Sequence, residues 1–443
     1  MTAVARLDAE LDGELFSPGS AGYEAFRRPA NPNYAEVYPR LLLRCGSAAD
    51  VARGIQFARE TGMPVVPRGG GHCFAGRSST EGIVLDLRGL DRVRVRDDGR
   101  AILGAGACLG QMYAALHAHG RTVPAGCGAS VGVAGLTLGG GIGLLGRIYG
   151  LTCDWLVSAQ VVLADGRIVE CDAQREPDLF WALRGAGGGQ FGVVTSLIFD
   201  TLPEPTTTRF ELRVFAGPLE RLIATWQRWA PGGPDDLTAN LTIVAEVGRR
   251  PYAVVFGAAL LDERLTRARL LEFCDLAGVS PEVDICGGLP YSHLKSTFEH
   301  LDAREELASG VRIRSELFAH PMHDATIDSL LSALVHGHAS GRRQLSFTAL
   351  GGAYNRVSQT ATAFAHRQQR FMLEHIIAGE PGDWVDRSWG IARADGSGRV
   401  YPNFPDLLLE DWQTAYHADN FSRLVAAKRA YDPNRLFTFP QSI

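Results

Sequence analysis

The stretch 67-PRGGGHCFAG-76 places three consecutive glycines directly in front of a histidine. Glycine is used where the backbone needs a positive φ or where another group must approach the chain closely. A run of three exceeds what one tight turn needs, so this loop is predicted to receive a ligand. The apolar run MPVVP predicts a short strand that leads into it.

Two further glycine-rich segments, 126–146 and 185–192, lie in the same part of the chain. Such loops expose backbone N–H groups, which bind phosphate oxygens well. Three of them around one extended ligand would suit a dinucleotide. Some glycines, such as Gly104 and Gly106, are expected to serve tight turns only.

The segments 141–146 and 187–192 both match the G-x-G-x-x-G pattern of NAD-binding proteins. That pattern requires a helix directly after it and an acidic residue about 20 positions later. After Gly192 the run VVTSLIF predicts a strand, and Asp165 belongs to an Asp-Gly hairpin. An NAD-dependent enzyme is therefore the least favoured of the alternatives.

Composition predicts an ordinary globular chain of two or three domains, with 443 residues, 46% of them hydrophobic and 21% charged. The net charge of −5 argues against nucleic acid as a partner. No apolar run reaches membrane-spanning length, and the N-terminus lacks the apolar core of a secretory signal, so a cytoplasmic location is expected. Eight cysteines without C-x-x-C spacing do not form a disulfide scaffold. The pair His336 and His338 lacks further ligands, so no metal site is predicted.

The first 200 residues alternate predicted strands and helices. The run 47–50 fits a helix cap, and Asp98-Gly99 and Asp165-Gly166 predict two hairpins. From about 209 to 401 the sequence pattern changes. Long segments predicted as strands, such as TANLTIVAEV, alternate with predicted amphipathic helices, such as ERLTRARLLEFCDLAG. This pattern favours a second α+β domain, a sheet with helices on one face.

Four blocks together carry a family resemblance. They are RGGGHCFAGRSS, VPAGCGASVGVAGLTLGGGIGLLGRIYGLTCD, LFWALRGAGGGQFGVVT, and the tail with YPNF and DPNRLFTFPQSI. In this order they resemble the FAD-linked oxidases of the vanillyl-alcohol oxidase/PCMH superfamily, and most closely the berberine-bridge-enzyme-like branch. The resemblance implies FAD rather than NAD.

The resemblance also implies the domain organisation and the α+β fold class. A PCMH-type FAD-binding domain would occupy residues 1–205. An inserted α+β substrate domain, an antiparallel sheet covered by helices, would occupy 206–400. The segment 401–443 would return to complete the FAD-binding domain.

In this branch the histidine that closes the RGGGH loop carries a covalent bond to the flavin, which implies that role for His72. A neutral imidazole nitrogen is nucleophilic near pH 7. Many members add a second bond from a cysteine that two residues separate from a V-G pair. Here three residues separate Cys127 from Val131, and Gly128 holds the expected position. A single bond through His72 is therefore predicted, with a second through Cys127 as the alternative; Cys73 is expected to pack away from the ring.

The resemblance implies one set of cofactor-binding residues drawn from all of these blocks. They are Arg68, Gly69, Gly70, Gly71, His72, Cys73, Gly76, Ser78, Pro124, Ala125, Gly126, Cys127, Val131, Gly132, Gly135, Gly139, Gly140, Gly143, Tyr149, Gly192, Val193, Val194, Tyr401 and Asn403.

The implied reaction removes a proton and a hydride from a C–H bond next to oxygen or nitrogen, or at an activated carbon, and dioxygen reoxidises the flavin to give peroxide. Tyr401 is the first candidate for the base, because it belongs to the family's Y-x-N-[YF] motif. The second aromatic of that motif, often a tyrosine credited with proton removal, is Phe404 here, which has no proton to exchange. Tyr354, on a predicted strand, is the second candidate, and His366 with Arg367 the third. An ionised tyrosine needs a nearby cation, and Arg367 or Arg393 are the candidates for it.

The expected partners are a small-molecule substrate and dioxygen, with no nucleic acid and no membrane, for a monomer or homodimer. Few acidic residues flank the flavin motifs, which favours tailoring of a hydrophobic or phenolic natural product. A carbohydrate or alcohol oxidase, a dehydrogenase and a flavin-binding protein without turnover are the alternatives.

Overall fold

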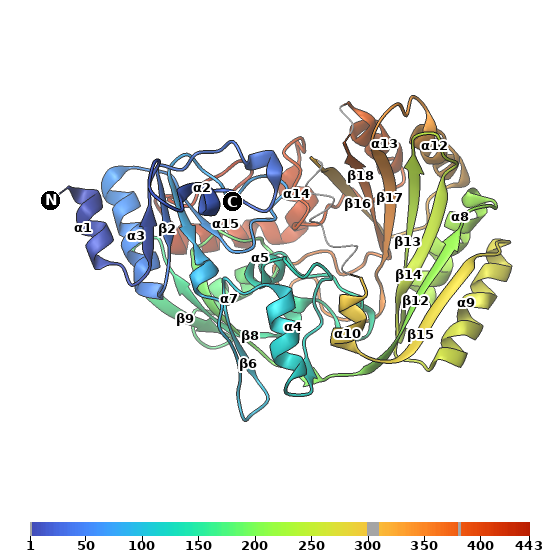
Figure 1. Ribbon diagram of the computed structural model, residues 1–443, viewed down its shortest axis with the longest axis horizontal. Coiled ribbons are helices and arrows are strands. Elements are labelled where there is room, and N and C mark those ends of the chain that lie inside the picture. Colours follow the sequence, from blue (N-terminus) through green and yellow to red (C-terminus); the bar gives the residue numbers. More distant parts are fainter. Residues whose placement is uncertain (1, 299–309, 380–381) are drawn as a thin grey trace.

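The computed structural model describes residues 2–298, 310–379 and 382–443. It consists of two halves, each built around its own large hydrophobic core (Figure 1). Both chain ends lie in the same half, and the middle of the chain forms the other. The expected α+β class is confirmed. Within the described ranges no helix is both long enough and apolar enough to cross a bilayer.

The terminal half contains a four-stranded sheet that leads into the RGGGH loop. Its order is β1 (Glu14–Phe16), β2 (Leu41–Arg44), β4 (Ile83–Asp86) and β3 (Val65–Arg68). β4 pairs in parallel with both β2 and β3. The helix α3 (Ala48–Thr61) covers it and begins as predicted, because the Ser47 side chain accepts a hydrogen bond from the Asp50 N–H.

A second, five-stranded antiparallel sheet completes this half. Its order is β5 (Val93–Val95), β6 (Ala101–Gly104), β10 (Val193–Phe199), β8 (Leu156–Val162) and β9 (Ile168–Asp172). Both predicted hairpins are confirmed, with Gly99 and Gly166 at positive φ. A small ladder joins β7 (Arg121–Thr122) to β11 (Leu202–Pro203).

The C-terminal segment packs back onto this half. α15 (Phe421–Tyr431) contacts α7 (Pro177–Leu183), and the backbone N–H of Ile443 donates to the Gln190 side chain at 3.2 Å. Gln190 belongs to the third glycine-rich loop, so the end of the chain supports that loop. The other helices of this half are α1 (Ala3–Glu10), α2 (Tyr23–Arg27), α4 (Leu109–His117), α5 (Val133–Leu138), α6 (Gly146–Tyr149) and α14 (Trp412–His417).

The middle half is one antiparallel seven-stranded sheet. Its order is β15 (Glu282–Pro290), β12 (Thr206–Val214), β14 (Tyr252–Ala259), β13 (Leu237–Glu246), β17 (Arg342–Ala349), β18 (Phe371–Ala378) and β16 (Arg312–Phe318). The helices α8 (Leu219–Gly232), α9 (Glu263–Ala277), α12 (Asp324–Val335) and α13 (Trp384–Arg393) cover its outer face, while α10 (Tyr291–Ser296) lies near the first half (Figure 1).

Side chains alternate between the two faces of this sheet, as strand geometry requires. On β13, Leu241 and Ile243 belong to the core under the helices, whereas Asn240 and Thr242 line the space toward the other half. Among the described residues, α10 packs against one end of the inner face, on β12 and β15, and the rest of this face lines the space toward the other half.

The strand predicted around Tyr354 is wrong. β17 ends at Ala349, and Tyr354 lies in a 3₁₀ turn, Gly352–Asn355. Gly351 and Gly352 both have positive φ, +84° and +56°, which a continuing strand does not tolerate.

Candidate active site

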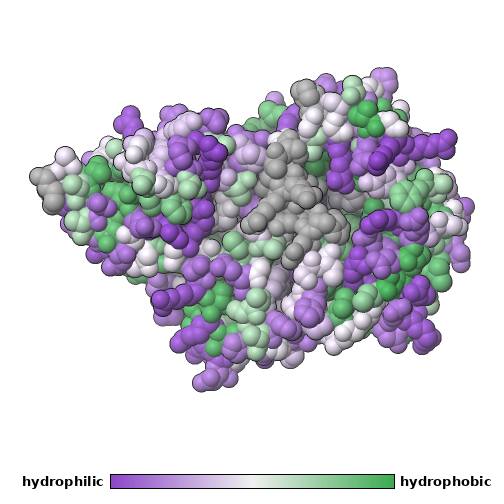
Figure 2. Space-filling model, in the orientation of Figure 1, coloured by the Kyte–Doolittle hydropathy of each residue, from purple (hydrophilic) through white to green (hydrophobic). Residues whose placement is uncertain are grey.

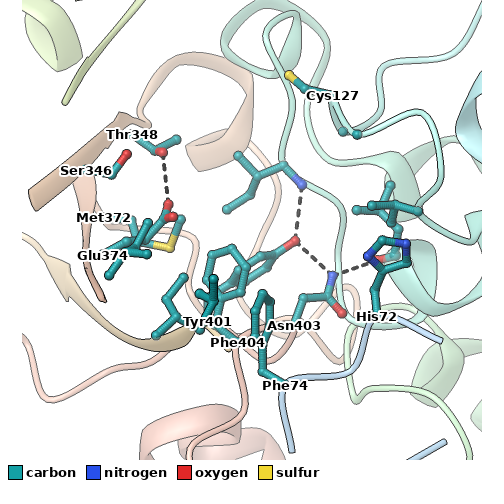
Figure 3. Close-up of a pocket in the computed structure, with 18 of the residues that line it drawn as sticks. His72, Phe74, Cys127, Ser346, Thr348, Met372, Glu374, Tyr401, Asn403 and Phe404 are labelled. Atoms are coloured by element: carbon teal, nitrogen blue, oxygen red, sulfur yellow. Dashed lines mark hydrogen bonds between the residues drawn. The ribbon is translucent and has the colours of Figure 1, made fainter. Parts of the chain in front are cut away.

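A cavity of about 1450 Å³ lies between the two halves. One wall is made by the three glycine-rich loops together with the segment 401–405, and the opposite wall is the inner face of the seven-stranded sheet. Figure 3 shows residues from both walls facing each other across this space. The cavity therefore joins the two features that the sequence separates, a glycine-rich cradle and an inserted sheet.

The glycines of the cradle fall into two structural classes. Gly70 and Gly132 lie back to back, and a Cβ on either would strike the backbone of the other. Gly135 and Gly187 differ, because a Cβ on either would meet nothing within 4 Å while both residues line the cavity. The first pair holds two loops together, and the second leaves room for a bulky ligand. This shape fits an extended cofactor such as FAD.

His72 ends the first loop and lines the cavity. A 3.1 Å hydrogen bond joins its Nε2 to the Oγ of Ser130, in the second loop. Arg68, four residues earlier, points the other way: its buried guanidinium donates to the carbonyls of Phe26, Arg27 and Ser78. Ser130 thus orients the imidazole, while Arg68 supports the loop from behind.

Tyr401 stands at the centre of a polar cluster (Figure 3). Its Oη accepts hydrogen bonds from the N–H groups of Gly141 and Ile142 and from Nδ2 of Asn403, at 3.1, 3.2 and 2.9 Å. Asn403 also donates to the Leu136 carbonyl at 2.9 Å. Burial raises the pKa of Tyr401 to about 12, so the phenol is neutral at physiological pH.

The cation expected beside an ionised tyrosine is engaged elsewhere. Arg367 pairs with Asp154 at 2.6 Å, and Arg393 pairs with Glu316 at 3.0 Å. Both arginines lie outside the cavity lining. The expectation that either of them activates a tyrosine base is therefore wrong.

Tyr354 and His366 also lie outside this lining. The Tyr354 hydroxyl donates to the carbonyl of Gly143 at 2.8 Å and accepts from its N–H at 3.1 Å. Burial raises the pKa of Tyr354 and lowers that of His366 to about 3. Tyr354 therefore holds the second glycine-rich loop through Gly143 and does not reach the cavity. This position does not fit a base, which must contact the substrate.

A carboxylate that the sequence analysis missed faces Tyr401 from the sheet. Glu374 on β18 lines the cavity, and the Oγ1 of Thr348 donates to it at 3.3 Å (Figure 3). Its neighbours Met372 and Ile376 share this face, while Leu373 packs into the core behind. The sequence signal that could have identified Glu374 is a single acidic residue within the otherwise largely apolar run 371–378.

Aromatic rings separate Glu374 from the histidine loop. The centroid of Phe404 lies 5.2 Å from that of Tyr401 and 5.6 Å from that of Phe74, both edge to face. These rings form an apolar wall where a flat ring system would stack.

Cys127 lines the cavity, but its thiol points away from His72 in Figure 3. Its Sγ accepts a hydrogen bond from the Nζ of Lys295 at 3.2 Å. Lys295 comes from α10, is 4% exposed and also donates to the Ala125 carbonyl at 3.3 Å. Burial lowers the pKa of this lysine.

The structure brings most of the predicted cofactor-binding residues to this one cavity. Those that line it are Gly69, Gly70, Gly71, His72, Cys73, Ser78, Gly126, Cys127, Val131, Gly132, Gly135, Gly143, Gly192, Val194, Tyr401 and Asn403. Those that do not line it are Arg68, Gly76, Pro124, Ala125, Gly139, Gly140, Tyr149 and Val193. Lining residues outside the predicted set include Phe74, Leu136, Ile142, Gly187 and Phe404.

Comparison with known proteins places this cavity in a family context. Residues 39–172 match the family model described as "FAD binding domain", and residues 400–443 match "Berberine and berberine like". The chain is 31% identical to "Uncharacterized FAD-linked oxidoreductase YgaK" of Bacillus subtilis (strain 168), over 98% of this chain and 97% of that protein.

Two further similarities agree with this match. The chain is 28% identical to the chitooligosaccharide oxidase of Gibberella zeae, over 90% of this chain and 85% of that one. The solved structure of Physcomitrella patens BBE-like 1 superposes with a TM-score of 0.88 at 25% identity, and covers 100% of this chain and 99% of its own. The fold, the cradle that fits FAD and these matches agree: the chain belongs to the berberine-bridge-enzyme-like family of FAD-dependent oxidoreductases.

Proposed function

We propose that this protein is an oxidase that acts on a C–H bond next to oxygen or nitrogen in a polar small molecule. FAD, when bound, accepts the hydride and passes its electrons to dioxygen, which yields hydrogen peroxide. The observation that carries the proposal is the position of Glu374, a carboxylate on the inserted sheet that faces the Tyr401 cluster across the cavity.

His72 holds the cofactor through a single covalent bond in this proposal. Its place at the end of the glycine loop and its hydrogen bond with Ser130 support the role, since both fix where the imidazole points. The direction of the Cys127 thiol, toward Lys295, speaks against a second bond.

Glu374 takes the proton from the substrate. A general base must lie within hydrogen-bond reach of the proton that it takes, and Glu374 lines the cavity together with Met372 and Phe404 while Thr348 donates to its carboxylate. Tyr401 does not fit the role of base, because burial raises the pKa of its phenol to about 12 in spite of the three N–H groups that point at its oxygen. Tyr401 is instead proposed to hold the second glycine-rich loop and to donate its hydroxyl proton into the cavity.

The sheet wall indicates a polar substrate. The preference for a hydrophobic one rested on a shortage of acidic residues near the flavin motifs, yet Glu211 and Glu374 both line the cavity from the inserted sheet. Tailoring of a natural product stays the first candidate, with a polar substrate in place of the hydrophobic or phenolic one expected from the sequence. Carbohydrate oxidation is the second, favoured by the row of hydroxyl and amide groups Asn240, Thr242, Gln344, Ser346 and Thr348.

Anaerobic stopped-flow spectroscopy of the purified holoenzyme tests this function. Polycyclic alcohols and amines form one arm of the substrate panel, and mono- and oligosaccharides the other. We expect one class to bleach the flavin, and air to restore the colour with stoichiometric peroxide. Failure of the whole panel, or a reduced flavin that is stable in air, would contradict the proposal.

A further inference from the structure

Four arginines line one end of the cavity. Arg213 comes from β12, Arg342 from β17, and Arg249 and Arg250 from the turn between β13 and β14. Tyr252 lies among them, with Glu246, Arg342, Arg249 and Arg213 all close enough to act electrostatically on its hydroxyl. Hydrophilic residues gather over this part of the sheet in Figure 2.

The carboxylates beside this arginine cluster do not neutralise it. Glu211 is bridged by Arg209 and Arg213, and Glu246 pairs with Arg249 at 2.9 Å. Within the parts of the chain that the structure describes, Arg250 and Arg342 have no carboxylate partner.

The Nε of Arg342 instead lies 2.9 Å from the neutral side-chain amide of Gln344, while Glu246 stands opposite Arg342 in the strand ladder without an ion pair to it. In the described part of the chain, two guanidinium groups therefore line the cavity without an ion pair of their own.

The sheet register places this cluster at a defined distance from Glu374. Across five neighbouring strands the paired residues are Glu374, Ser346, Thr242, Val254 and Arg213. Four strand spacings of about 4.8 Å separate the ends of this row, or about 19 Å. Arg342 stands four residues from Ser346 on β17, or about 13 Å along the strand. Nothing charged interrupts the row between its two ends.

We propose that Arg213, Arg249, Arg250 and Arg342 form an anion subsite. It would bind a carboxylate or phosphate group at the far end of a substrate whose reacting carbon lies beside Glu374. Planar guanidinium groups suit both oxyanions because they donate two parallel hydrogen bonds. The inference rests on the proposed function and narrows its substrate class to anionic molecules that extend about 13–19 Å from the reacting carbon.

Equilibrium dialysis of the holoenzyme against three matched probes tests the subsite without turnover. The probes are 1-naphthoate, 1-naphthyl phosphate and the neutral 1-naphthamide, at constant ionic strength. We expect at least one anion to bind about 10-fold or more tightly than the amide, as charge-assisted hydrogen bonds require. Tighter binding of the phosphate indicates a phosphorylated substrate, and tighter binding of the naphthoate indicates a carboxylic acid.

Charge-removing variants localise the effect. The double variant Arg250→Gln with Arg342→Gln should lose the preference for anions, whereas Arg228→Gln, an exposed arginine on α8 outside this cavity, should keep it. Arg250 is exposed, so Arg250→Gln alone serves if the double variant does not accumulate. Equal binding of the anions and the amide, or a preference that survives the substitutions, would overturn the subsite.

The two proposals fail separately. If the anion preference disappears when the arginines are replaced, but no substrate reduces the flavin, the anion subsite is supported and the oxidase proposal is refuted. If a substrate reduces the flavin but the holoenzyme shows no preference for anions, the oxidase proposal is supported and the anion subsite is refuted.

Discussion

The Nζ of Lys295 lies 3.2 Å from the Sγ of Cys127, across the boundary between the two halves. The lysine is almost fully buried, and the rings of Tyr113 and Tyr291 lie 5.2 and 5.3 Å from its ammonium group. Its hydrogen bonds go to Cys127 and to the Ala125 carbonyl. The thiol therefore has a structural partner on the side away from His72, which explains physically why a second flavin bond is not expected.

Replacing Cys127 distinguishes a covalent bond to the flavin from a structural hydrogen bond with Lys295. Cys127→Ala should leave the flavin covalently attached while it destabilises the protein by about 1–3 kcal/mol, because a buried ammonium loses an acceptor. Denaturing gels and thermal unfolding measure the two effects. Cys286→Ala, at an exposed cysteine, is the control and should change neither. Release of the flavin from Cys127→Ala would refute this assignment.

Gly135 tests whether the open side of the cradle receives the cofactor. A side chain at Gly135 meets no protein atom within 4 Å, so Gly135→Val should fold normally yet lose most of its FAD. Gly390, in α13, has the same open surroundings and lies outside the cavity. Gly390→Val should therefore keep its FAD, as measured by the flavin-to-protein absorbance ratio. Equal FAD content in both variants would contradict the assigned position.

Glu374→Gln should slow reduction of the flavin by a factor of about 10²–10⁴, the usual contribution of a general base. The amide keeps the size and the hydrogen bond from Thr348, so FAD content and substrate affinity should stay close to wild type. Thr348→Val removes only that hydrogen bond and should have a smaller effect. Stopped-flow reduction rates check both variants, and a rate unchanged by Glu374→Gln would remove Glu374 from the mechanism.

Three buried histidines predict a loss of stability in acid. Burial lowers the pKa of His366, His375 and His417 from 6.5 to about 3. Because these folded-state values are depressed, unfolding takes up protons, and stability falls as the pH drops from about 6.5 toward 3. Each histidine contributes a slope of about 1.4 kcal/mol per pH unit in that window.

Denaturant unfolding of the holoenzyme at several pH values measures this slope. His375→Gln keeps a hydrogen-bonding partner for Ser388, which lies 2.8 Å from the histidine Nδ1. The variant should lower the slope by about 1.4 kcal/mol per pH unit, the contribution of one histidine. An unchanged slope would show that His375 does not remain neutral in the fold.

Local patterns in the sequence predict the parts of this fold that depend on neighbouring residues. The cap at Ser47, the hairpins at Gly99 and Gly166 and the ligand loop before His72 are all of this kind. The position of Tyr354 was predicted wrongly because the sequence alone does not show that Gly351 and Gly352 end the strand and do not continue it.

The remaining parts of the site depend on contacts between distant residues. Lys295 and Cys127 stand 168 positions apart, and no periodicity links them. Glu374 was missed for a similar reason, since only the register of β18 decides which face of the sheet it joins.

A denaturing mass spectrum of the purified wild type beside His72→Ala tests the central claim most directly. The account predicts that the wild-type chain carries the added mass of one FAD and that His72→Ala carries none. A wild-type chain without the FAD mass, or a His72→Ala chain that retains it, would contradict the role assigned to His72.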